Sequence, residues 1–291
     1  MASGETITSA ISDSLDTVMS AARQVQEHEG VISKLCDVKT LGENIGETWR
    51  EISYAKLTAS SITETSWSDN YQQISDTALT ITPTQIEVVT LITDVVGRRV
   101  NKAGLAQMVT LGQNAIERKK DLDGLTAGAA GTALGGAGNT MLSGYISAAT
   151  ARILGNASEK GSPPLRAVLH PYHIKDLFDE LVAGVGTYVL TEGPTARVFQ
   201  EGFSKLPVAG CEVYGDGNMS VDSSDDAVGC VFTQKGLILV QGKAPWKVAQ
   251  REERYAGGST RVFHRDEYAY GERSSGNWVY AVTADATAPT S

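Results

Sequence analysis

Cysteine, aromatic side chains and long apolar runs are all scarce in this 291-residue chain. The three cysteines, Cys36, Cys211 and Cys230, are too few and too dispersed for a disulfide framework, and no CxxC pair is present to hold a structural zinc ion. A reducing cytoplasm is therefore the expected place of folding. No apolar stretch approaches the roughly 20 residues that a membrane helix needs. Residues 1–20 also lack the basic run before an apolar core that marks a secretory signal.

Positive charge is in deficit as well. Lys and Arg number 25 against 34 Asp and Glu, which gives a formal net charge of -9. Because contacts to phosphate require Lys and Arg, this balance argues against a chain whose main task is to wrap nucleic acid. Each of two local basic clusters is either a solvated helix face or a patch for a partner. The clusters are Arg98/Arg99/Lys102 and Arg118/Lys119/Lys120.

The first predicted element is an amphipathic helix of about five turns near the N-terminus, because apolar residues recur there at steps of three and four. These residues are Ile7, Ile11, Leu15, Val18, Ala22 and Val25. Such a stripe must be buried on something. The helix is either an arm that docks on a neighbouring molecule or the first helix of a globular domain.

A protruding hairpin is predicted between Gly42 and Thr82. This stretch is rich in Thr, Ser, Asn and Glu, and apolar residues alternate at Ile52/Tyr54 and at Leu79/Ile81, which is typical of half-exposed strands. Residues 59–69 form a polar tip without Gly or Pro. A two-stranded hairpin is marginally stable alone in water, so we expect it to be mobile in the free chain and ordered on a partner.

A strand and a long helix are predicted next. The β-branched run from Ile86 to Val96 predicts a buried strand that leads into a helix starting near Thr93 or Asp94. Leu105–Leu125 carries the apolar stripe of a helix of about 25 residues, roughly 35–40 Å long. Gly112 and Ala115 on this stripe allow another backbone to approach closely. Five glycines follow within residues 127–139, the first at Gly128 and the last at Gly138. They predict a hinge between two lobes.

The second half predicts a separate α/β layer. One helix is expected over 142–153 and another from Pro171 to Leu181, since proline suits a first helical turn. Short strands are expected at 167–169, 196–200, 210–214 and 228–232. A turn at 234–236 should join the last of these to 237–240 as a hairpin. The alternating segment 261–284 should return to the first half, before a polar tail at 283–291.

The most suggestive polar cluster is His170 and His173, with Asp176 one turn later. Two histidines three residues apart can share a metal ion. However, His170 falls at a strand end and His173 in a first helical turn, so the rings need not face the same way. The simpler alternative is a strand-to-helix joint whose polar side chains bond to nearby backbone groups.

Other patterns point only weakly to chemistry. The glycines of 131–138 lack the lysine and hydroxyl residue of a phosphate loop and follow a helix. Asp222, Asp225 and Asp226 could hold calcium, but their spacing fits a solvated acidic loop better. Cys211 and Cys230 fall in apolar strand contexts, as small hydrophobes do.

Ordinary helix-surface pairs are expected for Asp94 with Arg98 and for Glu117 with Lys120 or Asp121. No GxSxG nucleophile motif is present. We therefore predict no catalytic, cofactor-binding or metal-binding residue in this chain.

The order of arm helix, extended hairpin, long helix and α/β lobe resembles the major capsid protein of tailed bacteriophages, the Hong Kong ninety-seven fold. Leu79–Pro83 followed by Ile86–Val96 is similar to the return strand of its extended loop, which runs to its spine helix. Ala167–His173 with Leu177, Phe178 and Leu181 resembles the strand–helix unit that opens its axial lobe. Residues 203–217, 227–240 and 261–285 resemble its later strands, so the similarity covers about residues 2–284.

The resemblance implies an α+β fold in five parts. These are an N-terminal arm (1–48), an extended loop (49–82), a peripheral domain with the spine helix (83–135), an axial domain (136–255), and return strands with a C-terminal tail (256–291).

The resemblance also implies a structural subunit rather than an enzyme. It would self-assemble into pentamers and hexamers of an icosahedral capsid that encloses double-stranded DNA without sequence-specific binding or a membrane. The implied location is the virion, with assembly in the host cytoplasm. Few residues precede the loop, so a separate scaffolding protein is expected, together with a portal; a decoration protein is an open option. Some relatives cross-link through Lys and Asn, and Lys56 lies in the loop, but nothing in the sequence supplies the matching geometry.

Three alternatives remain. The chain could form a nanocompartment (encapsulin-like) shell around an enzyme cargo, act as a metal-dependent enzyme that uses His170 and His173, or serve as a sheet-rich binding module on a virion or cell surface. A shell subunit is expected to contain little pocket volume.

Overall fold

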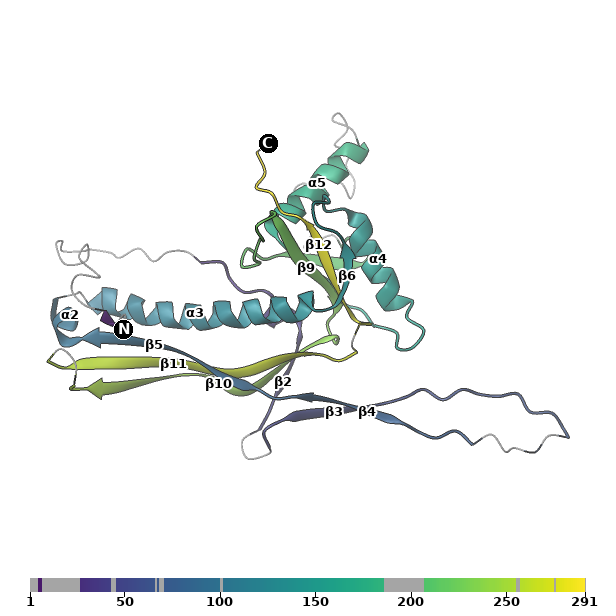
Figure 1. Cartoon of the computed structure of the whole chain (residues 1–291), viewed down its shortest axis with the longest axis horizontal. Helices are drawn as coiled ribbons and strands as arrows, with labels where there is room; N and C mark the ends of the chain where they lie inside the picture. The colour runs from purple at the N-terminus through teal and green to yellow at the C-terminus, as the bar shows by residue number, and fades with distance from the viewer. Residues whose placement is uncertain are drawn as a thin grey trace.

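The computed structural model is an α+β protein with two five-stranded sheets and a separate two-stranded hairpin (Figure 1). It describes residues 5–6, 27–42, 46–65, 67, 71–99, 102–185, 207–254, 257–274 and 276–290. The expected α+β class is confirmed. The helix predicted from Ile7 to Val25 and the strand predicted at 196–200 lie outside the described residues.

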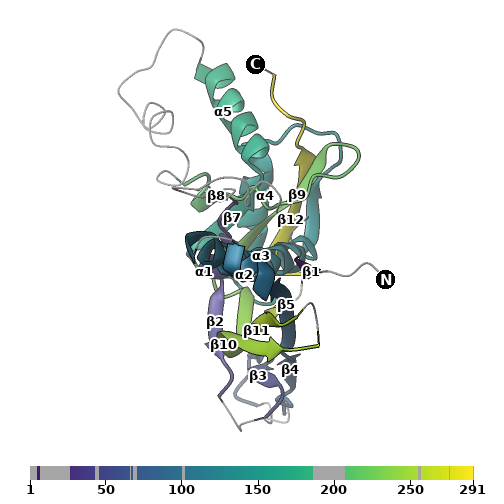
Figure 2. The same cartoon turned by 90° about the vertical axis from the view of Figure 1, so that its left-hand side faces the viewer.

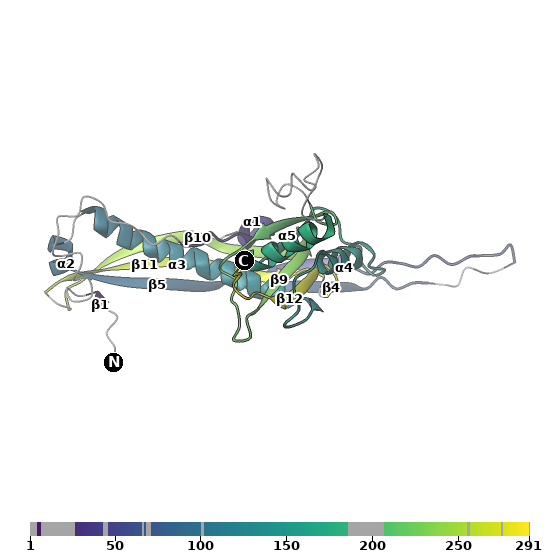
Figure 3. The same ribbon diagram turned by 90° about the horizontal axis from the view of Figure 1, so that it is seen from above.

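The first sheet is long and carries the long helix on one face (Figures 1 and 3). Its strands, in spatial order, are β1 (Glu5–Thr6), β5 (Thr84–Thr93), β11 (Ser259–Glu272), β10 (Leu237–Glu252) and β2 (Asp37–Thr40). β11 is antiparallel to both of its neighbours, β5 and β10. The β10–β11 ladder shifts register between Gln241 and Trp246, so the sheet contains a bulge under the helix.

The long helix is confirmed and is longer than expected. α3 (Lys102–Ala129) has 28 residues and so spans about 42 Å. The short helix α2 (Asp94–Arg99) precedes it and starts at the predicted position, where the Thr93 side chain accepts the backbone N–H of Val96 at 3.4 Å. The prediction that another backbone approaches Gly112 is wrong, because the close neighbour is a side chain. A Cβ there would lie 2.5 Å from Cδ2 of His264.

The prediction that 86–96 forms a buried strand is wrong in one respect. β5 alternates between exposed and partly buried residues along most of its length, and Val89 is exposed. Only one face of an antiparallel sheet needs to be covered, and α3 covers one face here. A run of β-branched residues therefore occurs on a strand that is half open to solvent.

The second sheet forms the core of the other lobe. Its strands, in spatial order, are β6 (Thr132–Gly135), β12 (Val279–Asp285), β9 (Asp226–Thr233), β7 (Leu165–Leu169) and β8 (Cys211–Gly215). The helices α4 (Ser143–Leu154) and α5 (Pro171–Val185) add Ile146, Ile153 and Leu177 to its apolar core. The helices predicted at 142–153 and from Pro171, and the strands predicted at 167–169, 210–214 and 228–232, are confirmed.

Two strand pairings were predicted incorrectly. The turn after β9 is present, with Gly236 N–H donating to Thr233 O at 2.7 Å, but β10 then crosses to the first sheet and does not pair with β9. Of the segment expected to return to the first half, only β11 does so. β12 pairs with β9 in the second sheet, in register from Val279↔Phe232 to Asp285↔Asp226. Alternation predicts a strand but does not say which neighbour it pairs with.

The glycine-rich stretch is a packed connection rather than a loose hinge. α3 continues to Ala129, and β6 then pairs in parallel with β12. A Cβ on Gly131 would lie 2.6 Å from the carbonyl oxygen of Val279. Gly135 has φ +78°, and a Cβ added to it would lie equally close to the carbonyl oxygen of Thr283. Glycine is needed here because two backbones approach each other and because one residue is left-handed.

One apolar core joins the two sheets. It combines side chains of α3, of the short helix α1 (Ile32–Leu35) and of strands from both sheets. Members include Leu125, Ile32, Phe232, Val168 and Leu239. The two lobes therefore share a continuous apolar core.

Candidate functional surfaces

The lobe that contains the first sheet is called the first lobe, and the lobe that contains the second sheet is called the second lobe. A hairpin projects from the first lobe (Figure 1). β3 (Trp49–Tyr54) and β4 (Asp76–Ile81) pair antiparallel, from Trp49↔Ile81 to Tyr54↔Asp76, as the sequence predicted for this region. Beyond the ladder, Ala55 N–H donates to Ser75 O at 3.0 Å and Thr58 N–H donates to the side chain of Gln72 at 2.8 Å. The side chain of Gln72 also donates to the carbonyl oxygen of Thr58.

The hairpin exposes a set of large apolar side chains, called here the hairpin apolar residues. Trp67 is 87% exposed and Tyr71 is 90% exposed. The full set is Ile52, Tyr54, Leu57, Ile62, Trp67, Tyr71 and Ile74. Monomeric soluble proteins rarely expose so many large apolar side chains along one segment, and such a segment usually meets a partner.

The base of the hairpin is firmly attached to the body. Ile81 packs with Ile238 and Val240, and Trp49 and Leu79 lie against them. Arg273 forms ion pairs with Asp37 at 2.9 Å and with Glu51 at 2.8 Å. The side chain of Lys56 donates to the carbonyl oxygen of Ala157 at 2.7 Å, so in this chain it contacts a backbone carbonyl of the second lobe.

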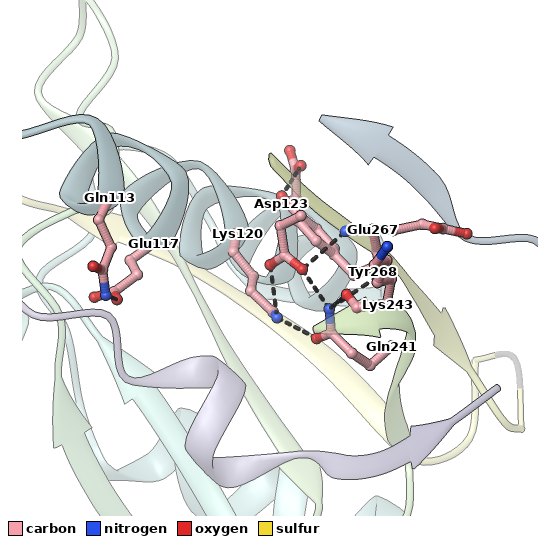
Figure 4. Close-up of polar contacts among 9 residues, drawn as sticks. Gln113, Glu117, Lys120, Asp123, Gln241, Lys243, Glu267 and Tyr268 are labelled. Carbon is pink, nitrogen blue, oxygen red and sulfur yellow. Dashed lines mark hydrogen bonds and ion pairs between the residues drawn. The ribbon is translucent and has the colours of Figure 1, made fainter. Parts of the chain in front are cut away.

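A buried polar cluster lies between α3 and the bulge of β10 (Figure 4). Lys120 Nζ lies 3.1 Å from Asp266 Oδ2 and also donates to Gln241. Gln241 Nε2 in turn donates to the carbonyl oxygens of Lys243 at 2.7 Å and Glu267 at 3.0 Å. The side chain of Gln241 thus binds carbonyl oxygens at the bulge, where the ladder is interrupted.

Tyr268 ties the helix to β11 beside this cluster. Its hydroxyl donates to Asp123 at 3.0 Å. Burial raises the pKa of the Tyr268 hydroxyl, and the Asp123 carboxylate raises it further. The phenol therefore stays protonated and remains a donor.

The predicted basic cluster on α3 is used within the chain. Arg118 pairs with Glu27 at 2.9 Å, Lys119 pairs with Asp123, and Lys120 is buried against Asp266. The expected pair of Glu117 with Lys120 or Asp121 does not form, because Lys120 turns under the helix. Glu117 instead accepts from Gln113 at 3.0 Å.

In the other basic cluster, Arg98 and Arg99 are exposed. Arg98 donates to the backbone carbonyl of Asp94 at 3.3 Å, whereas the Asp94 carboxylate pairs with both guanidinium N–H groups of Arg251. That pairing lowers the pKa of Asp94. The side chain of Lys102 is outside the described residues.

A groove of about 1210 Å³ runs between residues 27–34, α3 and the strands β10 and β11. The expectation of little pocket volume is therefore wrong. Glu117, Trp246 and His264 are among its lining residues. The buried ring of His264 has no partner at Nε2 within the described part of the chain, and burial lowers its pKa.

His170, His173 and Asp176 are not brought together as a metal site. The ring centroids of the two histidines are 6.2 Å apart. His170 Nδ1 accepts the N–H of Tyr172 at 3.3 Å, the buried His173 Nε2 lies 3.1 Å from the carbonyl oxygen of Ala284, and Asp176 accepts from Met141 N–H at 3.2 Å. Burial lowers the pKa of both histidines. Only the His170 bond is the local backbone contact expected of a strand-to-helix joint, since His173 and Asp176 bond to backbone groups distant in the chain. The described residues contain no group of three or more metal-binding side chains.

The acidic loop is solvated at Asp222 and Asp225, as predicted, but Asp226 is buried. Asp222 Oδ1 accepts the N–H groups of Ser224 at 2.8 Å and Asp226 at 3.0 Å. The buried Asp226 accepts from Gly138 N–H at 2.6 Å, which joins this loop to the glycine-rich stretch.

Sequence reasoning missed several polar residues that join segments distant in the chain, including Asp121, Asp216, Gln241, Asp266 and Arg273. Their partners lie far away in the chain, so no local spacing marks them. Of these residues, only Asp121 could have been noticed in the sequence, because it is a charged residue between apolar positions of the predicted helix. Among the described helices, none is long and apolar enough to cross a membrane.

The sequence matches no protein-family model and no curated protein sequence. Its fold does match solved structures. The acidic stable capsid structure of Helicobacter pylori bacteriophage KHP30 gives a TM-score of 0.71 at 12% identity and covers 96% of this chain and 98% of that chain. The capsid structure of the cyanophage P-SCSP1u gives 0.68 at 12% identity, covering 93% and 92%.

A third match is the holo-SrpI encapsulin complex from Synechococcus elongatus, with a TM-score of 0.63 at 8% identity, covering 94% of this chain and 95% of that chain. The matches extend over nearly the whole length of both chains. The expected fold is confirmed, and the chain has the Hong Kong ninety-seven fold of phage capsid structures.

Proposed function

We propose that this chain is a structural, non-catalytic subunit that self-assembles into the pentamers and hexamers of an icosahedral capsid around double-stranded DNA. The observation that carries the proposal is the exposure of the hairpin apolar residues on a fold that phage capsid structures share. A lone subunit leaves Trp67 and Tyr71 in water, which is unfavourable, and a neighbouring copy can bury them.

The charge balance supports the same function. The net charge of -9 suits a shell that encloses DNA without gripping it. Arg118, Lys119 and Lys120 are paired within the chain rather than available as a phosphate-binding patch. We further propose a virion location, assembly in the host cytoplasm, and a separate scaffolding protein and portal as partners; a decoration protein is the least supported partner.

The second candidate is a nanocompartment shell that holds an enzyme cargo. The match to the encapsulin complex favours it, at a TM-score of 0.63 against 0.71 for the KHP30 capsid. The gene neighbourhood separates the two. Terminase and portal genes beside this one support a capsid, whereas a cargo enzyme gene supports a nanocompartment.

Assembly of the purified full chain tests the shared part of both proposals. Sedimentation velocity and negative-stain electron microscopy should show rings or closed shells. The double substitution Trp67→Ser/Tyr71→Ser should reduce assembly at least tenfold at equal concentration, because it removes apolar area that only a neighbour can bury.

Val221→Ser is the matched control, since Val221 is also exposed but lies in the second lobe, away from the hairpin. It should assemble like the original chain. A chain that sediments only as a compact monomer, with residues 49–82 resistant to protease, would show that the hairpin does not serve assembly.

A further inference from the structure

Two buried aspartates both bond to Asn218 where three parts of the chain join. Asp121 lies on α3 and Asp216 lies in the loop after β8, and each is 1% exposed. The third part is the segment 27–35, which ends in α1 and packs on α3 through that helix (Figure 2). A Cβ on Gly30 would lie 2.9 Å from Cβ of Asp121, so the backbone of this segment passes directly over the Asp121 carboxylate.

The Asp121 carboxylate acts entirely as an acceptor. Its Oδ1 accepts the N–H groups of Val31 at 2.8 Å and Ile32 at 3.1 Å. Its Oδ2 accepts from the side-chain amide of Asn218 at 3.1 Å. Three donors therefore point at this one carboxylate.

Asp216 has the opposite pattern. Its Oδ1 accepts the N–H of Asn218 at 2.9 Å, whereas its Oδ2 is buried and receives no hydrogen bond within the described part of the chain. A buried oxygen without a partner is costly if it carries charge, but a proton on Oδ2 can be donated to the neighbouring Asp121 carboxylate. Burial, followed by the contact with Asp121, raises the pKa of Asp216 to about 7.

The other titratable groups around the pair do not replace this proton. Burial raises the pKa of Cys230 to about 12 and also raises that of Tyr270, so both are neutral near pH 7. Burial lowers the pKa of His170, which is neutral as well. The ring of His28, on segment 27–35, packs on Gly217 beside the pair, at 2.5 Å from a Cβ placed there.

We propose that Asp216 and Asp121 share one proton, and that this proton locks segment 27–35, α3 and the loop after β8 together. When the proton is lost, two carboxylates face each other in a buried site, and the junction opens to hydrate them. This proposal does not depend on the assembly proposed above, because all of its contacts lie within one chain.

The direction of the pH effect follows from proton binding. The closed junction holds a proton up to about pH 7, whereas an opened, hydrated Asp216 releases it near the ordinary value of 3.8. Opening therefore releases a proton in this window, and the opening constant should rise about tenfold per pH unit between about pH 4 and 7, then level off. The lock is strong in mild acid and weak above neutral pH.

Hydrogen exchange of the full chain tests the proposal. Protection factors are measured by mass spectrometry between pH 5 and 8, with EDTA present, for peptides covering 28–36 and 214–222. Protection should fall about tenfold per pH unit up to pH 7 in the original chain. Asp216→Asn should remove this slope and keep protection high, because its amide donates to Asp121 permanently, as the proton does.

Asp121→Asn provides an asymmetric second test. Its amide group would face the amide of Asn218, so this variant should lose protection at every pH, unlike Asp216→Asn. Asp179→Asn, a surface carboxylate paired with Lys175 on α5, is the control and should keep the original slope. The proposal is overturned if the original chain shows no slope, if Asp216→Asn retains it, or if millimolar Mg²⁺ without EDTA abolishes it, since a cation would then bridge the pair.

Discussion

At the scale of single residues, two adjacent lysines have different roles. Lys119 is an exposed partner of Asp123, whereas Lys120 lies under α3 with a side chain 15% exposed, against an Asp266 carboxylate that is 1% exposed. The sequence places both in one basic cluster. Only the helix rotation, together with the bulge at Gln241, decides which of them is buried.

Lys120→Met should therefore destabilise the chain by about 3 kcal/mol, because it leaves the Asp266 carboxylate buried without its cation. Lys119→Met should cost about 0.5 kcal/mol or less, as for other exposed pairs one helical turn apart. Urea unfolding of the two variants measures the difference. Equal losses would mean that the Lys120 pair is not buried in solution.

The cysteines also show what burial does to a single group. All three are free and buried, and burial raises the pKa of Cys36, Cys211 and Cys230 to about 12. The sequence predicted this role for Cys211 and Cys230 from their apolar contexts.

We expect all three thiols to resist iodoacetamide at pH 8 in the folded chain, because the reactive thiolate is nearly absent and the sulfur is covered. All three should react in denaturing urea, which serves as the positive control. Mass spectrometry counts the modified thiols. Rapid modification of a folded chain would contradict the burial of that cysteine.

At the scale of elements, periodicity predicted α3, α4, α5 and the hairpin well. Helix and strand periods depend on which neighbouring residues share a face, and this information is local. The junction from α3 to β6 was not predicted, because glycines suit both flexible linkers and tight backbone contacts. Gly131 and Gly135 belong to the second kind.

Gly131→Ala should destabilise the chain by about 1–3 kcal/mol, because the added Cβ meets the rigid carbonyl of Val279 rather than a movable side chain. Gly144→Ala, in α4 with open space around it, should be neutral or stabilise by about 0.5 kcal/mol. Thermal or urea unfolding compares them. A neutral Gly131→Ala would restore the hinge interpretation.

At the scale of the whole molecule, a compact two-lobed body carries a long hairpin with little to pack against. An apolar core shared between α1, α3 and both sheets joins the two lobes of the body, and the second lobe has a further core with α4 and α5. The hairpin depends on a short ladder and on contacts at its base. Local opening is expected where few apolar contacts are buried.

Chymotrypsin should therefore cut the free chain first after Leu57, Trp67 or Tyr71, while the body remains intact. Under the proposed function, assembled shells should resist cleavage at the same sites at least tenfold. Timed digestion followed by mass spectrometry measures both states. Equal cleavage in free and assembled chains would show that neighbours do not cover the hairpin.

The sequence by itself determined the long helix, the hairpin and the lack of a local catalytic motif, because each depends on residue type and short-range spacing. Only the tertiary structure decided that β10 crosses to the first sheet, that β12 returns to the second, and that the glycine-rich stretch is packed. It also brought Asp121 to Asp216 and Lys120 to Asp266. These outcomes depend on which distant segments share a buried volume, and no local pattern carries that information.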